Sequence, residues 1–408
     1  MTQMPSSSNI GPTRLQARVE AIDAIRGFAL FGVLLVNMYN FGAYAPEWTG
    51  PVDRVFSSIM HSVFETKSLR LFSLLFGLGF ALQLARLISQ DGGSLWFFFR
   101  RLFFLFIFGM AHALLFDGDI LMEYALLGLI LVLFRNFRGR ILLILAIVLL
   151  AAFPVGNLVH TPGADDIRMQ LEDEMPLEEL RSGHPYLDAP MDVFEENASA
   201  IPPRIWSNLH DPESSLTLFA MLLLGFYIGR ARILQEINPE NIRLIRRTCG
   251  WGLAVGGVCA LTEWWLQLEF GYAVYSANQA TGGIRFLGDL LFAYGSTALA
   301  LGYGSGIALL ARKSKWRPIL KPLQNMGRMA LTAYLCGTVM FTTLFYGWGF
   351  GQLFLLGPAA TTFYATIFFV LQLVLCTWWL ARFRFGPAEW LWRSLTYMKL
   401  QPMKIDRE

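Results

Sequence analysis

Charged residues are scarce in this chain. They make up 15% of the 408 residues, whereas 55% are hydrophobic, and soluble domains carry roughly 25% charged residues. The sequence therefore predicts an all-α, polytopic integral membrane protein rather than a soluble domain. The net charge of +3 is small, and the basic residues stand in short groups between apolar segments. That distribution excludes nucleic acid as a partner.

Cysteine and histidine are also rare, with four and five residues. No C-x-x-C pair occurs and no histidine stands at metal-ligand spacing, so we expect neither a metal site nor a tightly bound cofactor. The sequence has no nucleotide-binding P-loop, which leaves an ion or substrate gradient as the only energy source for any transport. The first twenty residues lack the apolar region of a signal peptide, which favours an uncleaved first span.

Long apolar segments, in contrast, are abundant. Segments of about 17–25 apolar residues are long enough to cross a membrane as helices. The sequence predicts about ten such spans, at 23–42, 69–88, 97–116, 119–135, 140–158, 215–233, 249–268, 285–311, 328–348 and 359–381.

Basic residues alternate along the chain and indicate its orientation. Every second connection between the predicted spans is rich in Lys and Arg, which favour the cytoplasmic side. We therefore expect both termini to be cytoplasmic. The predicted parts are a cytoplasmic segment, a five-helix half, an acidic extracytoplasmic loop, a second five-helix half and an interfacial cytoplasmic segment, at 1–22, 23–158, 159–214, 215–384 and 385–408.

Ionisable residues concentrate in one stretch between two apolar runs, "HALLFDGDILMEYALLG". It contains His112, Asp117, Asp119 and Glu123, in the predicted extracytoplasmic half of the membrane. Ionisable residues at membrane depth cost roughly 2.5–3.5 kcal/mol each on insertion scales. Several of them together indicate a watery cavity, mutual pairing or a function.

Two interpretations of this stretch stay open. Asp119 opens a predicted helix, where its carboxylate can cap the exposed backbone N–H groups. His112 can hydrogen-bond simply within the bundle, or it can act as a base oriented by Asp117 or Asp119.

Further polar residues reach the same predicted level. Lys67 and Arg70 lie there against the positive-inside trend, which indicates partners or a site. Arg285 and Asp289 have the i, i+4 spacing of a helix-surface ion pair and equally fit a structural role. The predicted substrate cavity comprises Asn37, Glu65, Lys67, Arg70, Glu123, Arg285 and Asp289.

At the opposite membrane face, "DAIRG" places Asp23 and Arg26 at i, i+3. One interpretation is an anchoring arginine with a capping carboxylate. The other is a phosphate-binding cation at the mouth of a tunnel, together with Arg100 and Arg101 on the same face.

Five blocks carry a resemblance that covers almost the whole chain. They read "AIDAIRGFALFGVLLVN", "LFSLLFGLGFALQ", "FGMAHALLFDGDILMEYALLGLILV", "GRMALTAYL" and "FGPAEWLWRSLTYMK". As a set they resemble the YeiB-like membrane proteins, the family of domain of unknown function 418.

The N-terminal half is also similar to the transmembrane acyltransferase superfamily, which includes heparan-alpha-glucosaminide N-acetyltransferase. That resemblance implies an acyl donor, usually acetyl-CoA, that enters from the cytoplasm, and an acceptor modified on the far side. The heparan enzyme carries its essential histidine after the first span, shortly before a Trp; the matching stretch here, "YAPEWTG", has none. His61 is not at that position, so His112 is the expected base.

The sequence thus predicts a protein of the bacterial cytoplasmic (inner) membrane that transfers an acyl group from cytoplasmic acyl-CoA to an extracytoplasmic or lipid-linked glycan or lipid. His112 and Asp119 would remove the acceptor proton, Arg26, Arg100 or Arg101 would hold donor phosphates, and Lys67 or Arg70 would offset developing negative charge. The alternative is a gradient-driven transporter or lipid-handling protein without covalent chemistry. Membrane lipids are expected partners, and a homodimer is left open.

Overall fold

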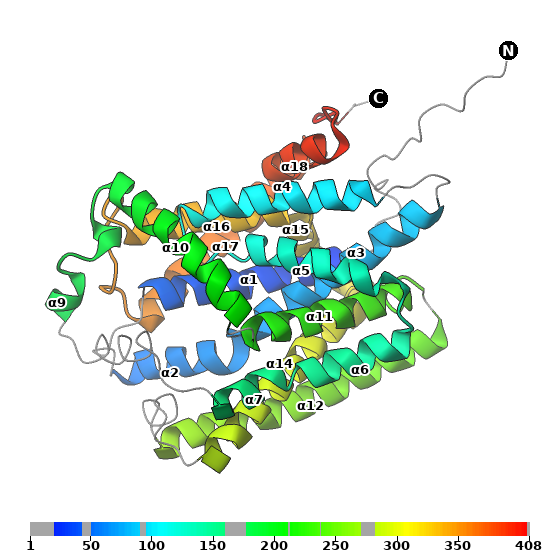
Figure 1. Cartoon of the computed structure of the whole chain (residues 1–408), viewed down its shortest axis with the longest axis horizontal. Coiled ribbons are helices and arrows are strands. Elements are labelled where there is room, and N and C mark those ends of the chain that lie inside the picture. Colours follow the sequence, from blue (N-terminus) through cyan, green and yellow to red (C-terminus); the bar gives the residue numbers. More distant parts are fainter. Residues whose placement is uncertain are drawn as a thin grey trace.

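The computed structural model describes residues 20–42, 50–89, 95–159, 177–210, 213–236, 238–270 and 282–405. Over these residues the chain is helical, without a strand, and an isolated bridge joins Phe383 to Lys404. The long helices lie side by side as a bundle (Figure 1). The all-α prediction is therefore confirmed for the described part of the chain.

Each predicted apolar segment contains a helix. The helices of the N-terminal half are α1 (Glu20–Gly42), α2 (Pro51–Ile59), η2 (Met60–Phe64), α3 (Lys67–Ser89), α4 (Trp96–Ala113), α5 (Leu121–Leu133), η3 (Phe134–Asn136), α6 (Gly139–Leu149) and α7 (Ala152–Val159). The remainder are α9 (Leu177–Arg181), η4 (Pro185–Leu187), α10 (Pro190–His210), α11 (Glu213–Arg230), α12 (Pro239–Phe270), α14 (Gly282–Leu310), η5 (Ser314–Trp316), α15 (Arg317–Arg328), α16 (Ala330–Phe345), α17 (Pro358–Leu380) and α18 (Pro387–Tyr397).

Length and hydropathy identify helices that can cross a membrane. Five stretches pass both criteria among the described residues: α1, the α2–α3 stretch, α4, the α6–α7 stretch and α17. A sixth arises if η5–α15 and α16, which meet at a bend of 85°, form one broken span. The molecule is a helical membrane protein.

The outer face of α17 shows the surface chemistry of such a protein. Phe363, Ile367, Val370 and Val374 are all exposed and lie on one face at i, i+3 and i+4 spacing. The opposite face buries Gln372, whose amide donates to the Ala333 carbonyl of α16 at 3.0 Å. The apolar stripe therefore faces the hydrocarbon, and the polar side chain faces the bundle.

Helices of the two halves pack against each other, α1 on α15 and α3 on α11. Glycines make the second contact close, because a Cβ at Gly77 would overlap the Leu222 carbonyl and a Cβ at Gly225 would overlap the Leu74 carbonyl. Small residues of this kind let membrane helices approach closely enough for extensive van der Waals contact.

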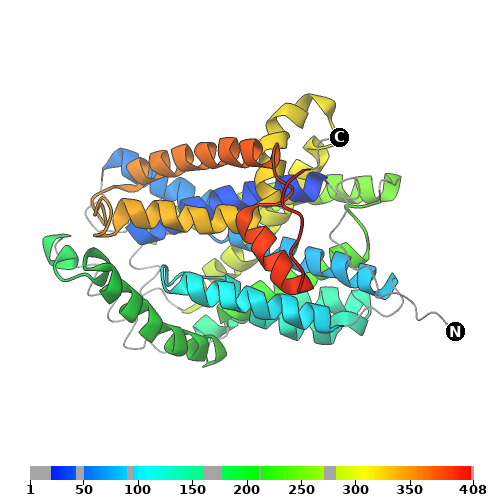
Figure 2. The ribbon, with the colours of Figure 1, turned by 90° about the horizontal axis from the view of Figure 1, so that it is seen from above.

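The region at 159–214, expected as an external loop, contains helices in its described part. The helices α9 and α10 lie on the left-hand side of the bundle in Figure 1, and the same two green helices are on the left in Figure 2. The Tyr186 ring of η4 stacks on Tyr346 with centroids 4.9 Å apart, and Arg181 donates to the carbonyls of Gly351 (3.1 Å) and Leu353. These contacts pack the described part of the region against the bundle, whereas a solvated loop would make few such contacts.

The glycine contact between α3 and α11 can be tested by adding a methyl group. Gly77→Ala should destabilise the protein by about 1–3 kcal/mol, since overpacking forces the helices apart. Gly79→Ala, on the same helix, has open space around the new Cβ and should be neutral or stabilising. Thermal unfolding in one detergent compares the two variants; equal midpoints would contradict the close packing.

Candidate functional site

His112 and Asp119 form a buried pair at the junction of α4 and α5. His112 is in the last turn of α4, and Asp119 lies just before α5. His112 Nδ1 is 2.7 Å from Asp119 Oδ1, and the two side chains are 1% and 0% exposed. Asp119 Oδ2 also accepts the Met122 N–H at 2.9 Å. The carboxylate therefore both caps α5 and contacts the histidine, two roles that its two oxygens allow at once.

The second ring nitrogen of His112 faces α16. His112 Nε2 lies 2.7 Å from Thr338 Oγ1, and Thr338 is 1% exposed. If the ring proton is on Nδ1, where Asp119 accepts it, Nε2 is an acceptor for the Thr338 hydroxyl. The Thr338 hydroxyl, the His112 imidazole and the Asp119 carboxylate thus form a hydrogen-bonded chain. Such a chain activates a hydroxyl for nucleophilic attack.

Helix α10 covers this network. Arg204 donates to the Asp119 carbonyl, and Asn197 Nδ2 donates to the Leu114 carbonyl at 3.1 Å. The hydroxyl of Tyr346 donates to the Leu115 carbonyl at 2.9 Å. Among the described residues, α10 therefore lies across the side of the network that the sequence predicts to face the extracytoplasmic space.

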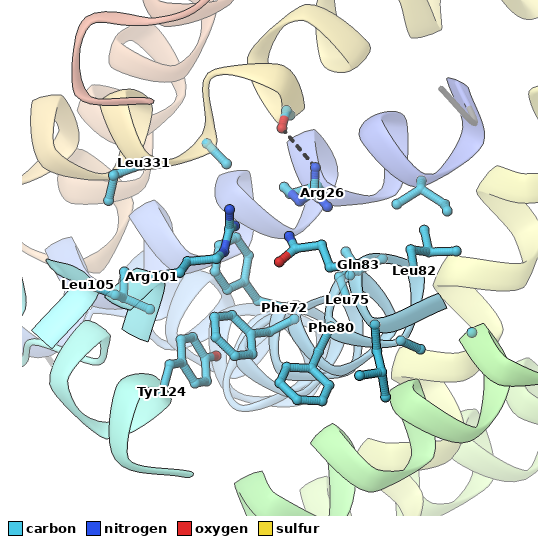
Figure 3. A pocket seen from close by; sticks show the side chains of 18 of the residues that line it. Arg26, Phe72, Leu75, Phe80, Leu82, Gln83, Arg101, Leu105, Tyr124 and Leu331 are labelled. Atoms are coloured by element: carbon cyan, nitrogen blue, oxygen red, sulfur yellow. Dashed lines mark hydrogen bonds between the residues drawn. The ribbon is translucent and has the colours of Figure 1, made fainter. Parts of the chain in front are cut away.

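A large cavity lies near the network, and Tyr334, whose ring is 4.8 Å from the His112 ring, is part of its wall. Its volume is about 1100 Å³, and side chains of α1, α3, α4, α5, α11, α15, α16 and α18 line it. In Figure 3, Arg26 donates to a backbone carbonyl, that of Gly327 at 3.2 Å, with Arg101 nearby and the rings of Phe72 and Tyr124 below them. The wall thus has a basic part and an apolar, aromatic part.

Eight arginines line this space, which we call the arginine cavity: Arg26, Arg86, Arg101, Arg135, Arg230, Arg232, Arg328 and Arg393. Three carboxylates line it as well, so the wall carries an excess of five positive charges. Asp23 pairs with Arg26 at 2.9 Å and Glu236 with Arg232 at 3.3 Å. Such an excess in a partly closed space attracts anions, above all phosphate groups.

The third carboxylate, Glu389 of α18, is held by the N-terminus of α16. Its Oε1 accepts the N–H groups of Leu331 and Thr332 at 2.6 and 3.1 Å, and its Oε2 accepts the Thr332 hydroxyl at 2.5 Å. Burial raises the pKa of the Glu389 carboxyl, and the hydrogen bonds from Thr332 and Leu331 oppose that shift. The Glu389 carboxylate therefore occupies this helix N-terminus, and the arginines are the groups of the wall whose charge suits an anion.

A second, small cavity of about 10 Å³ lies against Thr338. Leu30, Val33 and Tyr334 line both this cavity and the arginine cavity. The Tyr334 ring is also 4.8 Å from the His112 ring, centroid to centroid. Three side chains thus form the partition between the arginine cavity and the space in front of Thr338.

The other predicted site residues lie apart from His112 in varied surroundings. Asp117 is exposed in the turn before α5, and Glu123 accepts from Ser215 of α11 at 2.5 Å. Asn37 lines the small cavity. Arg100, unlike Arg101, is not part of the arginine cavity. Asp289 is buried in α14, and the side chain of Arg285 lies outside the described residues.

Glu65, Lys67 and Arg70 belong to a second charged group, which His61 and Glu263 complete. His61 Nδ1 is 2.5 Å from Glu65 Oε2, and His61 Nε2 is 3.1 Å from Glu263 Oε1. Lys67 Nζ donates to the His61 carbonyl at 2.9 Å, while Arg70 donates to the Ala293 carbonyl and, at 3.0 Å, to Thr297.

Lys67 and Arg70 are therefore bound to backbone carbonyls, an arrangement that stabilises the fold and does not require a substrate. The sequence contained a signal for this group, since two cations stood on the wrong side of the positive-inside trend. It contained none for Glu263 as the partner of His61, because the two residues are 202 positions apart.

Bundle, cavity and buried network define a helical membrane protein with an anion-attracting chamber beside a histidine–carboxylate pair. A family model described as "Protein of unknown function (DUF418)" matches residues 228–399. The chain is 31% identical to the uncharacterized protein YeiB of Escherichia coli (strain K12), over 93% of this chain and 97% of the relative. It is 29% identical to the uncharacterized protein YxaH of Bacillus subtilis (strain 168), over 97% and 98%.

The chain therefore belongs to the YeiB-like, DUF418 family of membrane proteins, as its sequence blocks predicted. No solved structure matches it.

The double role of Asp119 predicts a graded loss of stability. Asp119→Ala removes the cap of α5 and leaves His112 buried without its partner, which should cost about 2–4 kcal/mol. Asp119→Asn keeps an acceptor for the Met122 N–H and should cost clearly less. Ala in place of the exposed Asp188 should change stability by no more than about 0.5 kcal/mol. Thermal unfolding midpoints give the order, and equal losses for Ala and Asn at 119 would contradict the capping role.

Proposed function

We propose that this protein is a membrane acyltransferase that moves an acyl group from cytoplasmic acyl-CoA to an extracytoplasmic or lipid-linked hydroxyl or amine. One observation carries the proposal: the arginine cavity ends at a partition behind which lies the His112–Asp119–Thr338 network. An anion-binding chamber and a proton acceptor thus stand within one side-chain layer of each other.

The two parts of the cavity wall match the two parts of the donor. Coenzyme A carries several phosphate charges at one end and a slender thioester arm at the other. The arginines suit the phosphates, and the wall formed by Phe72, Phe80, Leu105 and Tyr124 suits the arm and its acyl group. The volume of about 1100 Å³ slightly exceeds the roughly 300–1,000 Å³ of small-molecule sites, as a ligand of the size of acyl-CoA requires.

His112 supplies the proton chemistry of this reaction. Asp119 holds Nδ1–H and stabilises the imidazolium that forms when Nε2 takes a proton. Burial of the pair excludes bulk water, which would otherwise hydrolyse the thioester. A transporter needs a charged pathway but no hydroxyl–imidazole–carboxylate line, and this line is why we favour covalent chemistry.

For the membrane arrangement we propose ten spans: the five that length and hydropathy identify, the bent pair of η5–α15 and α16 as one broken span, and α5, α11, α12 and α14. Both termini then face the cytoplasm of a bacterial cytoplasmic membrane. The residues Arg26, Arg86, Arg135 and Arg230 lie at the same-side ends of α1, α3, α5 and α11, as the positive-inside trend requires. The arginine cavity would therefore open to the cytoplasm, where acyl-CoA is made.

Orientation can be tested with exposed serines. Ser199→Cys, on α10, should react with a membrane-impermeant thiol reagent added to intact cells, because this region is extracytoplasmic in the proposal. Ser314→Cys, in η5, should react only after the membrane is opened. Both substitutions are made in a variant that lacks the four native cysteines, so that only the introduced thiol can react. Labelling of position 314 from outside would overturn the orientation.

Donor binding can be tested with two adjacent arginines. An acyl-CoA at 100 times its Kd should stabilise the parent protein by about 2.7 kcal/mol. Arg101→Gln, which alters the cavity wall, should weaken binding by about ten- to a hundredfold, the value of one or two hydrogen bonds to a charged group. Arg100→Gln makes the same chemical change outside the cavity and should keep the stabilisation.

The measurement is the ligand-dependent shift of the unfolding midpoint, so differences in basal stability cancel. If acetyl-CoA and longer acyl-CoA donors at millimolar concentration leave the parent midpoint unchanged, the acyltransferase proposal fails. The transporter or lipid-handling alternative would then be favoured.

A further inference from the structure

Thr338 stands where a nucleophile would stand. Its Oγ1 lies 2.7 Å from His112 Nε2. The Tyr334 carbonyl, the usual partner of a threonine at this position of a helix, is farther away, at 3.5 Å. The shorter contact is the stronger hydrogen bond, so the hydroxyl is directed at the imidazole. Two threonines further along α16 behave differently, because the hydroxyls of Thr342 and Thr343 both donate to the Val339 carbonyl of their own helix.

We propose that Thr338 is the nucleophile of a two-step acyl transfer and carries the acyl group as a threonine ester. The inference rests on the proposed function and specifies its chemistry. Without an intermediate, His112 would have to accept a proton directly from the acceptor, yet Thr338 already occupies its free nitrogen. A relay through Thr338 uses the contact that the structure contains.

The first step conserves atoms and charge. His112 Nε2 takes the hydroxyl proton as Thr338 Oγ1 bonds to the thioester carbonyl carbon. The carbon–sulfur bond then breaks, and the departing sulfur receives the proton from the imidazolium, so free CoA leaves as the thiol. Asp119 retains its charge throughout and stabilises the imidazolium.

The second step reverses the roles. An acceptor hydroxyl or amine attacks the carbonyl carbon of the threonine ester and gives its proton to His112. The bond between Thr338 Oγ1 and that carbon breaks, and the imidazolium returns the proton to Oγ1. The acceptor is acylated, and no oxidant or further co-reactant is needed.

The small cavity marks the position at which the thioester would reach Thr338. Its volume of about 10 Å³ is close to the minimum for a single water, so it does not hold an acyl group as it stands. Leu30, Val33 and Tyr334 separate it from the arginine cavity, and rotation of the Tyr334 side chain would join the two spaces. A donor held by its phosphates in the large cavity would then present its thioester to Thr338.

A two-step route also suits the position of α10, which covers the network on the side away from the donor. Helix α10 covers the network through Arg204 and Asn197, and the arginine cavity lies behind the partition of Leu30, Val33 and Tyr334. An acyl-threonine lets the donor leave toward the arginine cavity before the acceptor arrives from the side of α10. The two substrates then never need to be bound together.

The test uses the purified full-length protein in lipid nanodiscs, given acetyl-CoA labelled in its acetyl group and no acceptor. The parent should release CoA in a burst of up to one equivalent per chain. After denaturation, the label should remain on the peptide that contains Thr338, as mass spectrometry would locate it. Octanoyl-CoA, treated the same way, covers a preference for longer chains.

Three variants make the result specific. Thr338→Val keeps the shape but not the hydroxyl; it should bind the donor, with an unchanged thermal shift, and take no label. Thr338→Ser should take label. Thr342→Val makes the same substitution one turn further along α16, at a buried threonine bonded within its own helix, and should label like the parent. His112→Gln should slow labelling by about 10²–10⁴-fold.

Two outcomes overturn the inference and differ in what they say of the proposed function. If Thr338→Val binds the donor and still releases CoA at the parent rate in the presence of a membrane lipid and glycan extract, the enzyme transfers directly. The acyltransferase proposal then stands and the threonine ester does not. If no donor shifts the parent midpoint and no CoA is released, both proposals fail together.

Discussion

Charged side chains inside an apolar bundle have to be paired or gathered, and this constraint arranges the whole interior of the protein. An isolated charge in hydrocarbon is costly, so each one must find a partner or a solvated cavity. His112 pairs with Asp119, and His61 stands between Glu65 and Glu263. Eight arginines line one chamber, where Asp23 pairs with Arg26 and Glu236 with Arg232, and the excess positive charge of its wall attracts anions.

The helices that carry these groups are fixed by contacts which leave little freedom. Gly77 and Gly225 let α3 and α11 approach to backbone distance, and Gly109 does the same for α4 against the Met122 N–H and Asp119. The last contact matters for the site, because any larger residue at position 109 would displace the carboxylate that orients His112. Close packing and polar geometry are thus one constraint at the α4–α5 junction.

Sequence reasoning predicted what depends on neighbours along the chain. The apolar segments predicted the helices because hydropathy over about twenty residues is a local property. The His112–Asp119 contact was predictable because seven residues across a tight turn return the chain to the same place. The positive-inside trend indicated which arginines share a face, but it could not separate Arg100 from Arg101. Consecutive helical residues point about 100° apart, and only packing decides which of them faces a cavity.

Contacts between distant parts of the chain could not be predicted in this way. Thr338 meets His112 across 226 residues, and a single threonine in an apolar helix carries no signal of its own. The region at 159–214 was read as an external loop from its acidic composition, yet its described part places α10 over the site. Its anchors are hydrogen bonds to the backbone carbonyls of Asp119 and Leu114. Backbone acceptors are present at every residue, so no sequence pattern announces them.

Mutation reveals the function only at residues whose chemical role can be separated from their structural role. Asp119 both caps α5 and orients His112, so a loss of activity on its substitution would not distinguish misfolding from lost chemistry. His112 and Thr338 are different, because neither caps a helix. A residue of similar shape at either position should therefore preserve most of the packing. Thr338 is the sharper of the two, since valine matches its shape and removes only the hydroxyl. The chemistry is therefore best examined at the residue whose contribution to packing can be kept while its reactive atom is removed.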